Sequence, residues 1–149
     1  MTAKVDDLLP TAKELMQQIA IAEAEKAAES MRKRAEAEAE KKHLLEALSK
    51  PSLSDEEAIR RGVAIINRAA KNGQTQVQVF RFPNELCTDH GRAINQMEPG
   101  WESTLTGVPK QVYQLWHSYL RPRGYKLRAE IVEWPGGMLG DIAITLSWQ

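Results

Sequence analysis

The stretch that decides the fold is Tyr125–Trp148, YKLRAEIVEWPGGMLGDIAITLSW. Apolar and polar residues alternate through its first part, 125–131, and again through its last part, 142–148. Because successive side chains of a strand point to opposite faces of a sheet, each part can lay one apolar face on a core. Pro135–Gly137 favours a turn or short loop between the two parts. The sequence therefore predicts a β-hairpin whose apolar face is covered by the preceding helices.

A third strand is predicted at 75–82, TQVQVFRF. Strict alternation places Val77 and Val79 on one face and Phe80 and Phe82 on the other. The strand therefore either contacts apolar material on both sides or contains a bulge near Phe80.

Three helices are predicted around this strand, over 55–71, 85–97 and about 108–120. Ser54 and Glu57 form a capping-box pattern at the start of the first, and Asn84 is placed to cap the second. With a long helix before them, the order is α-α-β-α-α-β-β. This order predicts an α+β fold with a three-stranded, mostly antiparallel sheet covered by about three helices.

The N-terminal third of the chain is predicted to be one long helix, or two nearly collinear ones, over residues 6–48. Asp6 or Asp7 can cap its start, and Pro10 is tolerated in a first turn. Ala, Glu and Lys, all good helix formers, dominate the rest. The break at 49–52 predicts two domains, a long charged helix over 1–50 and a small α+β domain over 51–149.

Apolar residues form a short heptad seam at the start of this helix. The seam consists of Leu8, Ala12, Leu15, Ile19 and Ala22. The following positions are mostly alanine, glutamate and lysine, too polar for a sustained coiled coil. Two interpretations remain, a solvated spacer helix or an arm that docks on another chain.

Composition excludes several classes of protein. The 149 residues carry 20 basic and 20 acidic side chains, and the balance holds separately for residues 1–50 and 51–149. Nothing in the net charge therefore favours a polyanionic partner or an anionic membrane. Cys87 is the single cysteine, which fits a reducing compartment. No run approaches the length of a membrane span, so a cytoplasmic protein is expected.

The one cluster of metal-binding or catalytic residue types is Cys87 with His90. Three apart on a helix, they share a face and could ligate one ion or form a nucleophile and its base. A zinc site needs three or four ligands, and only His117 and Asp141 could be added. We therefore predict no catalytic, cofactor-binding or metal-binding residue and no enzyme, with a small enzyme or metal site at Cys87 and His90 as the second alternative.

Nucleic-acid binding is the first alternative function. A basic strip runs through 121–128 and consists of Arg121, Arg123, Lys126 and Arg128. The order strand, helix, helix, strand over 75–134 also occurs in KH domains, but the GXXG loop between their helices is absent. Charge balance makes nucleic acid an unlikely partner.

Gly124–Trp148 resembles the ends of small phage-encoded proteins in its Gly-Tyr start, glycine turn and Ser-Trp end. This resemblance implies no activity. The sequence as a whole predicts a non-enzymatic protein-interaction or assembly module of bacterial or phage origin. Its partner is most simply a second copy, in a weak homodimer or small homo-oligomer formed through the N-terminal helix. The candidate interaction residues are Leu8, Leu15, Ile19, Trp101, Trp134, Arg121, Arg123 and Arg128.

Overall fold

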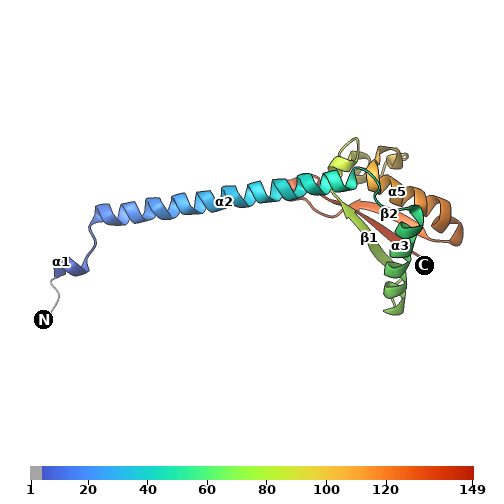
Figure 1. The fold of residues 1–149 in the computed structure, drawn as a ribbon, viewed down its shortest axis with the longest axis horizontal. Coiled ribbons are helices and arrows are strands. Elements are labelled where there is room, and N and C mark those ends of the chain that lie inside the picture. The colour runs from blue at the N-terminus through green and yellow to red at the C-terminus, as the bar shows by residue number, and fades with distance from the viewer. Residues whose placement is uncertain (1–4) are drawn as a thin grey trace. The chain divides into compact units, whose positions relative to one another are not determined.

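The computed structural model describes residues 5–149, which fall into two compact units divided between Lys42 and His43. The helices and strands, labelled in Figure 1, are α1 (Val5–Leu8), α2 (Ala12–Leu48), α3 (Asp55–Lys71), β1 (Gln76–Phe82), α4 (Arg92–Asn95), α5 (Gly107–Leu115), β2 (Lys126–Ile131) and β3 (Ile142–Ser147). Short 3₁₀ turns and one π-helical turn connect them. The predicted α+β fold class is confirmed.

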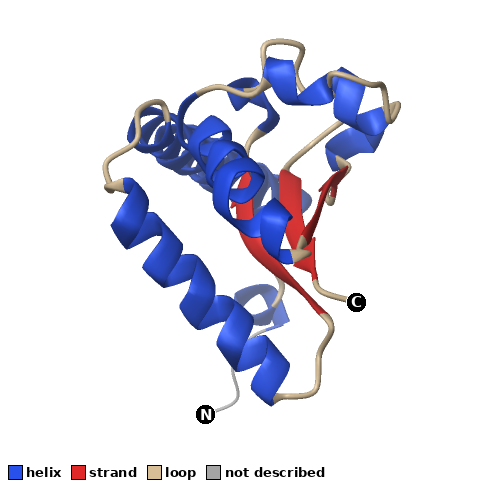
Figure 2. Ribbon diagram, turned by 90° about the vertical axis from the view of Figure 1, so that its right-hand side faces the viewer, coloured by secondary structure: helices blue, strands red, loops and turns tan. Residues whose placement is uncertain are grey.

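The three strands form one sheet in the order β1-β3-β2, and both pairs are antiparallel. Figure 2 shows the strands side by side, with α3 leading into β1 through a loop. The predicted hairpin is present as β2 and β3, with Ile131 opposite Ile142. A 3₁₀ turn at Pro135–Gly137 lies between them. β3, the second strand of the hairpin, is therefore the central strand of the sheet.

A bulge in β1 brings its aromatic residues onto the apolar face. Gln78 lies opposite Thr145 and Phe80 lies opposite Ile144, so Val79 has no partner across the pair. The extra residue reverses the alternation. Phe80 and Phe82 therefore face the core, whereas Arg81 between them faces the other side of the sheet. This is the bulge near Phe80 that one of the two sequence interpretations predicts.

The core lies on the face that this bulge completes. Its buried residues are Phe82, Leu86, Cys87, Ile94, Leu105, Ile142 and Ile144. Leu45 and Leu48, in the last turns of α2, also pack against it. These contacts explain why the compact unit begins at His43, before the break at 49–52 where the sequence suggests a domain boundary.

The opposite face of the sheet is polar and is bordered by an ion-pair group. Arg81 in β1 donates from Nε to Asp141 Oδ2 at 3.0 Å and from Nη2 to Glu133 Oε2 at 2.6 Å. The hydrogen bond to Asp141, with the charge of both carboxylates, raises the pKa of Arg81. These contacts join β1 to the two ends of the loop in the β2–β3 hairpin.

α3 begins and ends as its sequence predicts. Ser54 Oγ accepts a hydrogen bond from the Glu57 amide at 3.2 Å, and Asn72 ends the helix. Gly73 follows with a φ of +78°, the left-handed conformation that glycine favours at this position.

The predicted start of the long helix is wrong in one respect. α2 begins after Pro10, and Thr11 caps it through a reciprocal pair of hydrogen bonds with Glu14. This is a complete capping box, because Thr11 Oγ1 accepts from the Glu14 amide and Glu14 accepts from the Thr11 amide. Leu8 lies in α1, on the other side of Pro10. The continuous seam within α2 therefore begins at Ala12.

The predicted helix over 85–97 is also wrong. Residues 84–86 form a 3₁₀ turn, and only 92–95 are α-helical. Gly91 and His90 both have positive φ, of 84° and 56°, which interrupts any helix through them. The third predicted helix is present as α5 but changes at Trp116 into a π-helical turn, Trp116–Leu120.

Asn84 has a structural role other than the predicted helix cap. Its buried side chain donates from Nδ2 to the carbonyl oxygens of Leu139 at 2.7 Å and Gly140 at 3.1 Å. Two carbonyl groups of the hairpin loop thus depend on one amide group for hydrogen bonds.

Replacing Asn84 with alanine should lower the free energy of unfolding by about 1–3 kcal/mol, because both carbonyls lose their donor in a buried setting. Urea denaturation of the two proteins measures this difference. Asn67→Ala, at an exposed position of α3, is the matched control and should change stability little. Equal stabilities of the Asn84→Ala variant and the wild type would contradict this role.

Candidate functional site

The N-terminal unit exposes large apolar side chains along its helices. Neither α1 nor α2 contains a buried residue. Leu15 is 45% exposed and Ile19 is 50% exposed, and with Ala12 and Ala22 they follow one stripe of α2. Leu8 is 68% exposed but lies in α1. An apolar stripe that no described residue of the unit covers is a candidate contact surface.

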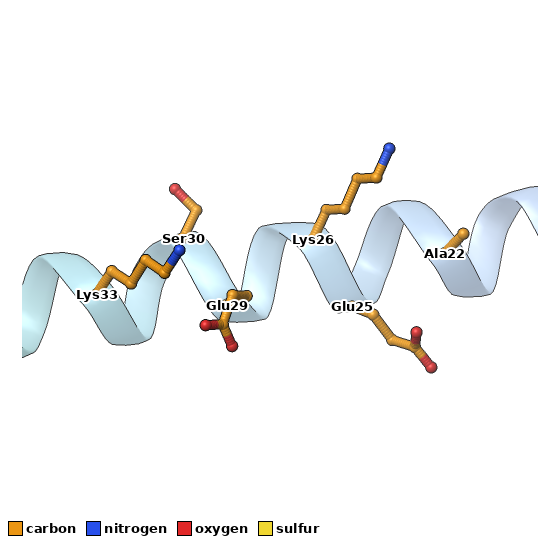
Figure 3. Close-up of a pocket in the computed structure, with 6 residues that line it drawn as sticks. All are labelled: Ala22, Glu25, Lys26, Glu29, Ser30 and Lys33. Carbon is orange, nitrogen blue, oxygen red and sulfur yellow. The ribbon is translucent and has the colours of Figure 1, made fainter.

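The middle of α2 is exposed to solvent. Figure 3 shows Ala22, Glu25, Lys26, Glu29, Ser30 and Lys33, which border a shallow hollow along one helix. Their side chains extend outward from the same helix, and the polar ends lie apart. A single helix cannot enclose a ligand, so this hollow is not a binding site.

The C-terminal unit contains an apolar groove between α3 and α5. Its volume is about 520 Å³. Its lining residues come from the end of α2, the segment after it, α3, β1, α5, the π-helical turn and β3: Ala47, Leu48, Ser52, Leu53, Ala58, Ile59, Arg61, Gly62, Val63, Ile65, Val79, Phe80, Val108, Gln111, Val112, Leu115, Trp116, Leu120 and Leu146. Arg61 is the one charged residue among them. Sequence reasoning did not predict this groove.

The polar groups in this groove are few and mostly occupied. Gln111 donates from Nε2 to the Leu53 carbonyl at 3.0 Å and to Asp55 Oδ1 at 3.1 Å. The Trp116 indole donates to the Tyr125 carbonyl at 3.0 Å. These bonds fix two of the lining side chains. The other polar side chains of the lining are the exposed Arg61 and Ser52, of which only Arg61 is charged.

The two tryptophans predicted as interaction anchors lie in different settings. Trp101 is half-buried, packs against the core and meets Tyr113 edge to face at a ring distance of 5.6 Å. Trp134 is 53% exposed, just before the 3₁₀ turn of the hairpin. Trp134 therefore remains available as a contact residue, and Trp101 covers the edge of the core.

The predicted basic strip is exposed, but its members make local bonds. Arg128 Nη2 lies 3.4 Å from Glu130 Oε1, and Arg123 Nη1 donates to the Tyr119 carbonyl at 2.6 Å. Arg121 is exposed in the turn after the π-helical segment. A carboxylate beside Arg128 reduces the positive potential of the strip.

Cys87 and His90 do not share a helix face. Cys87 pairs as an isolated bridge with Leu105 and is 2% exposed, whereas His90 is exposed in a turn. Burial is the main reason that the pKa of the Cys87 thiol is raised to about 11. Among residues 5–149, no group of three or more His, Cys, Asp or Glu side chains could hold a metal ion.

We expect the Cys87 thiol to be unreactive in the folded protein. A pKa of about 11 leaves only about one thiol in a thousand ionised at pH 8, and the thiolate is the reacting form. Iodoacetamide labelling followed by mass spectrometry should show slow modification at pH 8 and fast modification after denaturation. Stoichiometric labelling within minutes at pH 8 without denaturant would contradict this expectation.

Nucleic acid should bind weakly at most. The charge balance of the chain gives little release of counterions, which drives most non-specific binding. Fluorescence anisotropy with a labelled oligonucleotide at about 150 mM salt measures the affinity of the protein for nucleic acid. Binding that is lost in the Arg121→Ala/Arg123→Ala/Arg128→Ala triple variant would instead assign the strip to nucleic acid.

No protein-family model, curated protein or solved structure matches this chain. Among the described residues, no helix is both long enough and apolar enough to cross a lipid bilayer. The exposed stripe of α2 and the groove are therefore the two candidate functional surfaces of the described residues.

Proposed function

We propose that this protein is a non-enzymatic assembly module that associates with a second copy of itself through residues 5–22. The observation that carries the proposal is the apolar stripe of α2, which has large side chains and no buried residue. Amphipathic packing usually supplies most of the stability of a helix in water. A partner that covers Leu15 and Ile19 supplies that packing here.

A second copy is the simplest partner because the stripe repeats at alternating steps of three and four residues. Ala12, Leu15, Ile19 and Ala22 follow this spacing, which suits the packing of two like helices. The stripe covers fewer than two heptads, and two of its four positions are alanine. The association is accordingly weak, a homodimer or small homo-oligomer.

The cytoplasmic setting expected from the sequence belongs to the same proposal. A single cysteine that is buried as a free thiol fits a reducing compartment, where no disulfide is needed.

Replacing Ile19 with glutamate should weaken self-association at least tenfold, because a charge then enters the apolar contact of both copies. Glutamate is a good helix former, so α2 itself is kept. Sedimentation equilibrium over a range of concentrations measures the association constant. The wild type should show a mass that rises with concentration, and the variant should remain a monomer.

Ile21→Glu is the matched control, since Ile21 is also exposed on α2 but lies about 200° around the helix from Ile19. This variant should associate like the wild type. A wild type that stays monomeric at high micromolar concentration would overturn the proposal. An equal loss of self-association in Ile19→Glu and Ile21→Glu would also overturn the proposal.

A further inference from the structure

We propose that the groove between α3 and α5 binds a small apolar molecule with an anionic end, of the class of medium-chain carboxylates. This proposal goes beyond self-association and does not depend on it. The groove lies wholly within residues 43–149, whereas the proposed contact between copies lies within residues 5–22.

Three local irregularities of the backbone or sequence border this one groove. At the β1 bulge, the consecutive residues Val79 and Phe80 both line the groove. The π-helical turn supplies Trp116 and Leu120. Bulges and π-helical turns occur frequently at functional sites, where they redirect side chains.

The third irregularity is Gly62 in the interior of α3. Glycine there costs helix stability relative to alanine. A Cβ atom added at Gly62 would have nothing within 4 Å, so close packing does not require the glycine. Its absence of a side chain instead keeps the α3 wall of the groove open. A groove that admits a ligand therefore accounts for Gly62, although glycine at this position lowers the stability of α3.

Size and lining favour a small molecule as the occupant. A volume of about 520 Å³ falls within the range of roughly 300–1,000 Å³ found for ligand pockets. Such pockets have mostly apolar walls and few polar groups that orient the ligand. The side chains of Val63, Phe80 and Trp116 provide the apolar surface here.

The charge of the groove identifies the polar end of the ligand. Arg61 is exposed at its edge and makes no ion pair among the described residues, whereas its neighbour Arg60 is paired with Glu56. No carboxylate is among the lining residues. A free guanidinium beside an apolar surface complements a carboxylate, which it can hold by two parallel hydrogen bonds.

Decanoate, below its micelle-forming concentration, is the probe, and isothermal titration calorimetry of the full chain measures its affinity. One molecule should bind per chain. Octanoate should bind roughly tenfold more weakly, because two fewer methylene groups leave water. Decan-1-ol should also bind at least about fivefold more weakly, because it lacks the charge that Arg61 holds.

Two variants test the assigned residues. Gly62→Leu should abolish binding by filling the open wall, and its thermal stability should equal or exceed that of the wild type because leucine favours the helix. Arg61→Gln should lower decanoate affinity about fivefold to tenfold and leave decan-1-ol affinity unchanged.

The controls are Asn67→Leu and Arg68→Gln, which make the same kinds of change on α3 at residues outside the groove lining. Both should bind decanoate like the wild type, as should Ile19→Glu, the variant that tests self-association. Absence of decanoate binding would overturn the proposal. That result is expected if side chains of a partner protein, and not a small molecule, fill the groove. Unchanged binding in Gly62→Leu, or equal affinities for decanoate and decan-1-ol, would overturn it as well.

Discussion

The register between β1 and β3 is the constraint on which the rest of the structure depends. The bulge at Val79 allows Phe80 and Phe82 to lie opposite Ile144 and Ile142 on one face. Without the extra residue, the two phenylalanines would point to the polar face and the core would lose its largest buried side chain. Val79 and Phe80, the two residues at this shift, also line the groove, so the same local irregularity contributes to the core and to the surface of the groove.

The two units expose apolar surface for different physical reasons. In α2, the stripe around Leu15 and Ile19 is exposed, and among the described residues of its unit none is buried against it. Around the groove, helices are present, but there is open space beside Gly62 of α3, and Val79 and Phe80 of the sheet are among the lining residues. The first arrangement suits a long flat contact with another chain, and the second suits a compact ligand held from several sides.

Sequence periodicity predicted the hairpin, the third strand, α3 with its Ser54 cap, and the α+β class, because each depends on local alternation or capping chemistry. It failed over 85–97, where His90 and Gly91 adopt positive φ and tertiary contacts of Asn84 replace helix hydrogen bonds. Pairing of Cys87 with Leu105 has no local signal in the sequence. The groove joins residues from 47 to 146, so only an unexplained glycine at position 62 of an otherwise regular helix could have indicated it.

The central place of β3 also governs how a newly made chain can fold. β1 and β2 do not pair with each other, and each has its one neighbour in residues 142–147. During translation, both strands therefore have unpaired edges until residues 142–147 have emerged from the ribosome and can pair with them. A chain that is truncated shortly before Ile142 lacks the strand that joins β1 to β2, so this sheet cannot form in it. Unpaired strand edges of this kind make a partly folded chain prone to aggregation, so the pairing of β3 with both neighbours is also what protects β1 and β2.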